Sequence, residues 1–176
     1  MHPSWFVFRV LCALGVSAVR FCSEVMSRLY DPRLPDILRR MRWSALPERY
    51  VLAGIDPRES AVAIRLLGGL RARLWQLFVA PDTITFILPE SDWRSLSPAF
   101  PRARVERPYR VVSFEIDLPP DLTGFLAVIS EALAAASVPI VAISGFSRDH
   151  LLVREADLDR TLATLDALVS SAAAER

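Results

Sequence analysis

Hydrophobic and polar residues alternate most regularly in the second half of the chain. From Val112 to Asp117 they alternate one by one, which predicts a half-buried antiparallel strand over residues 111–117. Residues 122–136 carry apolar side chains at helical spacing, with Asp121 as the expected N-cap and Thr123 as a weaker one. The block then continues through residues 138–144, which are apolar throughout and predict a strand near the centre of a sheet.

The end of the chain predicts one more strand and one more helix. Residues 150–153 are largely apolar and read as a strand. From Glu155 onward, a helical stripe is formed by Leu158, Leu162, Leu165 and Val169. Between the strands lies a break of small and polar residues, 144–150, longer than a tight hairpin needs.

The first half of the body repeats this order less regularly. Residues 49–56 predict a strand, residues 59–68 a helix, and residues 74–80 and 83–90 a hairpin around Pro81-Asp82. Prolines at 89, 98, 101 and 108 then predict a loop-rich crossing to residue 110.

The repeated order of strand, helix, strand, strand and helix predicts an α+β fold. We expect two ferredoxin-like modules of βαββα(β) type, with antiparallel sheets and helices on one face. The second copy offers no fourth strand after residues 172–174, and strands shared between the copies would supply it. The expected divisions are an N-terminal extension (1–45), a first, divergent module (46–110) and a second module (111–176).

The N-terminal segment 5–22 is strongly apolar but has several interpretations. No basic residue precedes it, and Arg9 and Arg20 leave only residues 10–19 uncharged, fewer than the roughly 20 residues that span a bilayer. It is either a short membrane anchor with snorkelling arginines, a helix docked on the body, or a start that is not native. Membrane contact is expected only through this segment; otherwise we expect a cytoplasmic protein.

Composition excludes several kinds of chemistry. The chain has no Lys, which removes Schiff-base catalysis and the P-loop lysine. His150 is the only histidine outside the terminus, and Cys12 and Cys22 lack zinc spacing. We therefore expect no enzyme, no metal site and no cofactor. The cations, all Arg, are scattered rather than set along one face, so we expect no nucleic-acid partner.

A family resemblance rests on two short motifs. Residues 144–149, Ser-Gly-Phe-Ser-Arg-Asp, precede the apolar run 151–153, and Thr123-Gly124 lies upstream at a helix start. This combination resembles the tandem ACT-domain proteins, which include small bacterial ACT proteins and eukaryotic arginine sensors. The resemblance is good over residues 111–168, vaguer over 46–110, and does not cover 1–45.

The resemblance implies a non-catalytic regulatory or sensor protein that binds an amino acid at a module interface. Main-chain groups at the helix start would hold the ligand's carboxylate and amine, Phe146 would wall its side chain, and Asp149 would pair with a cation. The implied ligand-binding residues are Thr123, Gly124, Phe125, Leu126, Ser144, Gly145, Phe146 and Asp149.

Two departures from the family pattern leave a second interpretation open. Gly145 replaces the usual Thr, and Arg148, whose cation could pair with Asp149, replaces a small or polar residue. The alternative is a degenerate ACT module that serves only protein–protein interaction. In either case we expect a homo-oligomer or a regulated protein partner.

Overall fold

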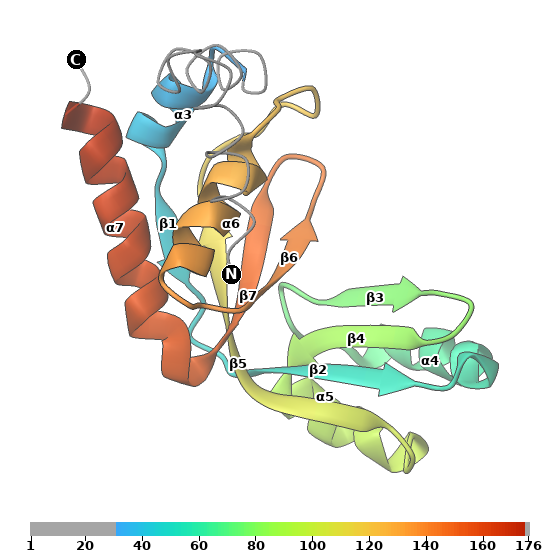
Figure 1. The fold of residues 1–176 in the computed structure, drawn as a ribbon. Coiled ribbons are helices and arrows are strands. Elements are labelled where there is room, and N and C mark those ends of the chain that lie inside the picture. Colours follow the sequence, from blue (N-terminus) through green and yellow to red (C-terminus); the bar gives the residue numbers. More distant parts are fainter. Residues whose placement is uncertain (1–30, 175–176) are drawn as a thin grey trace, which may run out of the picture.

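A continuous antiparallel sheet connects the two halves of the chain (Figure 1). The computed structural model describes residues 31–174; the apolar segment 5–22 and the two cysteines lie outside the described residues. The strand order is β3-β4-β2-β5-β7-β6, with β1 paired to β5. None of the helices in this described part combines the length and apolar character of a membrane span.

The first module is a complete ferredoxin-like unit. Its elements are β2 (Tyr50–Ile55), η1 (Pro57–Glu59), α4 (Ser60–Leu66), η2 (Leu67–Gly69), β3 (Gln76–Val79), β4 (Ile84–Pro89), α5 (Glu90–Leu96), η3 (Ser97–Ala99) and the first part of β5 (Arg104–Phe114). Its strands lie in the order β3-β4-β2-β5, so β5 supplies its fourth strand.

The second module is completed by a strand from the N-terminal side. It consists of the second part of β5, α6 (Phe125–Ala135), β6 (Ile140–Ser144), β7 (Asp149–Arg154), η4 (Glu155–Asp157) and α7 (Leu158–Ala174), together with α3 (Leu34–Arg40) and β1 (Trp43–Ala45). Because β1 pairs with Val112–Phe114 of β5, the order is β1-β5-β7-β6. Residues 34–45, which the sequence assigns to an extension, thus supply the missing fourth strand. The predicted α+β fold with two ACT-like modules is confirmed.

The strand β5 changes partners halfway along its length. Its first part pairs with β2 and its second part with β7. Between the pairs Tyr50–Tyr109 and Leu52–Glu106 the register shifts, and Arg107 and Pro108 lie in this irregularity. A bulge is one of the few places where a sheet accepts proline, since the missing N–H leaves no gap in the ladder.

Alternation along the strands divides the core into three clusters. On the helix side of the first module, Phe86 and Trp93 centre a cluster between β2, β4, α4 and α5. On the helix side of the second module, Phe114 and Leu165 centre a cluster that also takes in α3. The third cluster lies on the opposite face, where both modules contribute: Tyr50, Ile87, Tyr109, Val111, Ile143 and Leu152.

Two predictions about elements are wrong. The crossing over residues 90–110 is not mainly loop, because α5 fills its start and β5 begins at Arg104 rather than at 111. The strand at 138–144 is not central: β6 lies at the edge of the sheet. It is apolar because Ile140 packs against the helix-side cluster and Ile143 is buried in the cluster on the other face.

Candidate functional site

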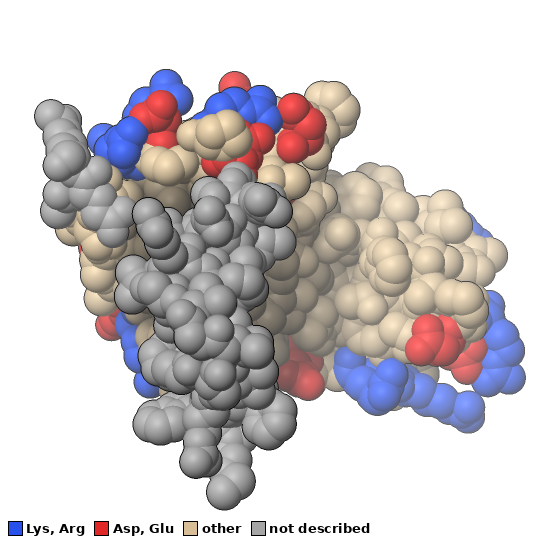
Figure 2. Space-filling model, turned by 45° about the horizontal axis from the view of Figure 1, so that its top comes forward, with Lys and Arg blue, Asp and Glu red and all other residues tan. Residues whose placement is uncertain are grey.

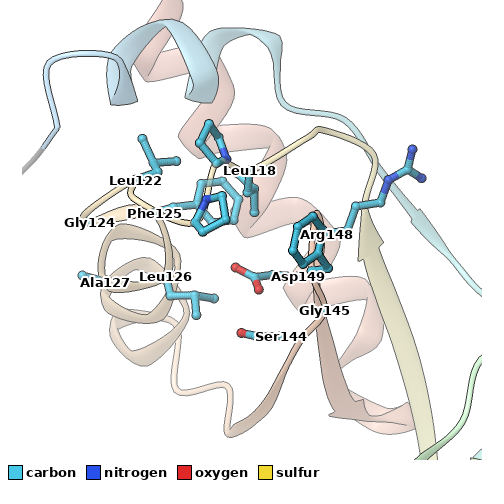
Figure 3. A pocket seen from close by; sticks show the side chains of 13 residues that line it. Leu118, Leu122, Gly124, Phe125, Leu126, Ala127, Ser144, Gly145, Arg148 and Asp149 are labelled. Atoms are coloured by element: carbon cyan, nitrogen blue, oxygen red, sulfur yellow. The ribbon is translucent and has the colours of Figure 1, made fainter.

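A pocket opens between the start of α6 and the hairpin that joins β6 to β7 (Figure 3). Its volume is about 450 Å3. It is lined by Leu118, Pro119, Pro120, Leu122, Gly124, Phe125, Leu126, Ala127, Ser144, Gly145, Phe146, Arg148 and Asp149. All the sequence-predicted site residues except Thr123 thus meet around one space, although their ligand role stays a prediction.

The helix α6 begins without a capping side chain. Its N-cap is Gly124, with φ 95°, a left-handed conformation that glycine adopts without strain. Asp121, the expected N-cap, is not the cap; its carboxylate pairs with Arg33 instead. The first helical bond runs from Val128 N–H to the Gly124 carbonyl at 3.0 Å. The N–H groups of residues 125–127 therefore have no acceptor within the helix, and these three residues line the pocket.

The hairpin supplies the polar side chains on the other side. Ser144 and Asp149 pair across β6 and β7, and Gly145 N–H donates to the Arg148 carbonyl at 2.8 Å. The break at residues 144–150 is therefore a compact turn of residues 145–148, not the long loop that the sequence predicts. The strands extend to Ser144 and Asp149, and both side chains point toward α6 in Figure 3.

A long loop from β5 to α6 forms the third wall. Leu118 N–H donates to the Ser147 carbonyl at 2.9 Å, which ties this loop to the hairpin. Arg148 points away from the pocket in Figure 3, and its Nε lies 3.9 Å from Asp117 Oδ1. The expected alternative, an Arg148–Asp149 pair, is not formed. Of the two charged lining residues, Asp149 is thus the one whose side chain points into the pocket.

Residues 31–33, which precede α3, contact the segment before α6 on the side away from the pocket lining. Asp31 N–H donates to the Thr123 carbonyl at 3.2 Å. Arg33 bridges the carboxylates of Asp31 at 2.6 Å and Asp121 at 3.0 Å. The hydrogen bonds from Arg33 lower the pKa of Asp31 to about 2. Thr123 therefore positions the turn through its carbonyl instead of lining the pocket.

Several lining residues were missed by the sequence analysis. Leu118, Pro119, Pro120 and Leu122 belong to the loop that precedes Gly124, and Ala127 lies one position beyond the predicted main-chain donors. In the sequence, the Pro119-Pro120 pair indicates only that the preceding strand ends. The loop forms a pocket wall because Leu118 N–H bonds to the Ser147 carbonyl, a main-chain contact between distant segments that the sequence does not reveal.

The remaining histidine does not enter the pocket lining. His150 follows Asp149 in β7 and so faces the other side of the sheet. Its Nδ1 is buried without a hydrogen-bond partner, and burial lowers its pKa. Within residues 31–174, no group of His, Cys, Asp and Glu is arranged to hold a metal ion.

Comparison with known proteins places this geometry in a family context. Residues 104–167 match the family model described as ACT domain. Among curated proteins, no sequence matches this chain.

Solved structures with a similar fold cover most of the chain. Protein Atu0741 from Agrobacterium tumefaciens is 21% identical, with a TM-score of 0.60 over 74% of this chain and 90% of that chain. Protein VC0802 from Vibrio cholerae is 17% identical, with a TM-score of 0.58 over 75% and 92%. The regulatory subunit of aspartate kinase from Thermus flavus is 13% identical, with a TM-score of 0.54 over 72% and 95%. Residues 104–167 thus match an ACT domain, and the chain as a whole resembles tandem ACT regulatory proteins in its fold.

Proposed function

We propose that the chain is a non-catalytic regulatory protein that binds an amino acid in the pocket between α6 and the β6–β7 hairpin. The observation that carries this proposal is that one pocket wall offers hydrogen-bond donors and the other offers a negative charge. One wall offers the main-chain N–H groups of the uncapped start of α6, and the other offers the Asp149 carboxylate with the Ser144 hydroxyl.

A zwitterionic amino acid fits this pair of walls. Its carboxylate suits a helix start, where unpaired N–H groups and the helix dipole favour an anion. Its ammonium group, or a cationic side chain, suits the Asp149 carboxylate. Leu118, Leu122 and Leu126 supply apolar surface for the rest of the ligand. Arg148 is held toward Asp117 and leaves Asp149 free for the ligand.

The structural comparisons support a regulatory role of this kind. The aspartate kinase relative is named as a regulatory subunit, and the fold similarity extends over most of both chains. By analogy, ligand binding here would change how the chain contacts a partner protein or a second copy. Such a change requires different ligand affinities in two states.

Thermal melting of the full chain against the twenty amino acids tests the proposal. The full chain is needed because Leu34, Ile37, Leu38 and Met41 are buried in the core of the second module. At a hundredfold excess over the dissociation constant, a ligand adds about 2.7 kcal/mol of stability, which raises the melting temperature by roughly 5–10 °C. A flat panel from a well-folded chain contradicts ligand binding.

Ligand analogues and one matched pair of variants locate the site. Asp149→Asn should weaken binding at least about tenfold, because a charge-assisted contact is lost. Asp82→Asn, in the corresponding hairpin of the first module, should leave it unchanged. The methyl ester of the active amino acid tests the helix wall, and its deaminated analogue tests Asp149. Equal binding by Asp149→Asn and the unmodified protein would place the ligand elsewhere.

The second candidate is a module that serves only protein–protein interaction. Phe146, at the rim of the pocket, is 93% exposed, and Phe78 on the edge strand β3 is 59% exposed. Figure 2 shows few charged side chains on the part of the first module where β3 forms the edge. An exposed apolar strand edge favours pairing with another chain. This candidate predicts a stable oligomer by ultracentrifugation together with a flat melting panel.

A further inference from the structure

A second cleft lies at the junction of the two modules, away from the α6 pocket. It forms where β5 passes from the first module to the second and β7 ends in η4. Its volume is about 660 Å3, and it is lined by Val105, Glu106, Arg107, Pro108, Tyr109, Arg154, Glu155 and Ala156. None of these residues lines the α6 pocket.

Both carboxylates of the junction cleft already have partners. Glu106 Oε2 accepts a hydrogen bond from the Tyr109 hydroxyl at 2.8 Å. Glu155 Oε1 accepts one from Arg49 Nε at 2.8 Å and also lies 3.8 Å from Arg110 Nη1. One oxygen of each carboxylate in the cleft is therefore already engaged by the protein itself.

Its two lining arginines, in contrast, form no ion pair with any residue between 31 and 174. Arg107 is presented by the register shift in β5, a feature that typically redirects a side chain. Arg154 is the residue of β7 that pairs with Tyr109. Arg107 and Arg154 thus line the cleft from neighbouring strands without a carboxylate partner among these residues, although Arg154 also hydrogen-bonds Tyr109.

We propose that the junction cleft binds a small oxyanion, a phosphate or a carboxylate, between Arg107 and Arg154. A guanidinium group presents paired N–H donors that match the oxygens of either anion. Counting Arg49 and Arg110, guanidinium groups outnumber carboxylates around the cleft, so the local charge favours an anion. A bound anion would brace β5 against β7 at the junction.

Calorimetric titration of the full chain with inorganic phosphate and with citrate tests this site. Total ionic strength is held constant with sodium chloride, since exposed charges respond to screening. We expect saturable one-site binding of one of the two anions. Binding of phosphate would identify the ligand as a phosphate, and binding of citrate would identify it as a carboxylate. Arg107→Gln and Arg154→Gln should each weaken binding at least about tenfold. The matched control is Arg65→Gln, which replaces an exposed arginine on α4 that forms no ion pair within the described part of the chain; it should bind as the unmodified protein does.

Two results would overturn the proposal. One is the absence of saturable binding by both anions. The other is an equal loss of affinity in Arg65→Gln, which would indicate a general response to charge. Thermal melting of each variant confirms that a loss of binding does not come from unfolding. The proposed anion site shares no lining residue with the α6 pocket, so Asp149→Asn should leave the anion affinity unchanged.

Discussion

The two modules share their strand order but differ at the hairpin that faces the first helix. In the first module Ala80 N–H donates to the Thr83 carbonyl at 2.9 Å, and in the second Gly145 N–H donates to the Arg148 carbonyl at 2.8 Å. The turns are therefore equivalent. The strand residues that flank them are Val79 and Ile84 in the first module, and Ser144 and Asp149 in the second.

The segments that lead into α4 and α6 also differ, because only the first has side chains that cap it. In η1, the turn that leads directly into α4, the Asp56 carboxylate accepts from Arg58 N–H at 2.9 Å and Glu59 accepts from Asp56 N–H, so the start of this helical segment is capped by its own side chains. Before α6, Gly124 provides no side chain. A single residue links β2 to η1, whereas residues 115–124 link β5 to α6 and build a pocket wall.

The comparison teaches that the fold alone does not make the pocket. Three local differences do so: a polar pair at the hairpin, an uncapped helix start and a longer loop. Each lies in a short segment of the second module. A variant that changes one of them tests its contribution separately from the shared fold.

The largest expected effect tests whether the two modules unfold as one unit. Phe86→Ala and Phe114→Ala each empty a fully buried position, one in each helix-side cluster. Each should cost about 3–5 kcal/mol of unfolding free energy. Because β5 belongs to both modules, we expect one urea transition followed by circular dichroism and by tryptophan fluorescence. Two transitions, with each variant shifting only one, would show that the modules are independent.

The next effect concerns the glycine at the start of α6. Gly124→Ala forces a side chain into φ 95°, at a cost of about 1–2 kcal/mol, and should also weaken amino-acid binding. Gly54→Ala in β2 is the control, because its new Cβ would lie 3.8 Å from Arg104 Nη2, an ordinary contact. Melting temperature and ligand affinity report the two effects. Equal melting temperatures for both variants would show that the left-handed turn is not required.

A smaller effect is expected where the first module caps its own helix. Asp56→Ala removes the acceptor for Arg58 N–H and should lower the melting temperature slightly without changing ligand binding. Hydrogen bonds from Arg58 lower the pKa of Asp56 to about 2, so its contribution is present above pH 4 and is lost as pH falls toward 2. Melting curves of variant and unmodified protein should therefore converge at low pH. A constant difference down to pH 2 would contradict the ionised cap.

Much of the fold could be predicted where apolar periodicity is long. The stripe that includes Leu165 predicted α7, and alternation around Phe114 predicted the second part of β5. The helix α5 was missed because two prolines flank a short segment. Its signals were present: Glu90 and Asp92 in the first turn, and Trp93 and Leu96 three residues apart.

The candidate site could be predicted only in its local parts. The motifs around Gly124 and Asp149 pointed to the residues that meet in the pocket. The pairing of β1 with β5, and the contact of Asp31 with Thr123, join segments far apart in sequence through main-chain groups. Such contacts leave no side-chain pattern. For the same reason, the compact turn at 145–148 could not be distinguished from a longer loop.

The smallest expected effect concerns the histidine next to Asp149. His150 pairs with Ile143 in β6, the position that Thr85 holds opposite Phe78 in the first module. Burial lowers its pKa; the nearby Asp149 raises it and Arg148 lowers it by smaller amounts. Because the folded-state pKa lies below the unfolded value, the unfolded chain takes up the proton first, and stability falls as pH decreases below about 6.5. His150→Thr, which copies the first module, should flatten the unfolding free energy between pH 5.5 and 7.5. If the unfolding free energy of the variant, measured by urea denaturation, still falls with pH as steeply as that of the unmodified protein, other groups cause the pH dependence. The buried Nδ1 of His150 would then have no effect on stability.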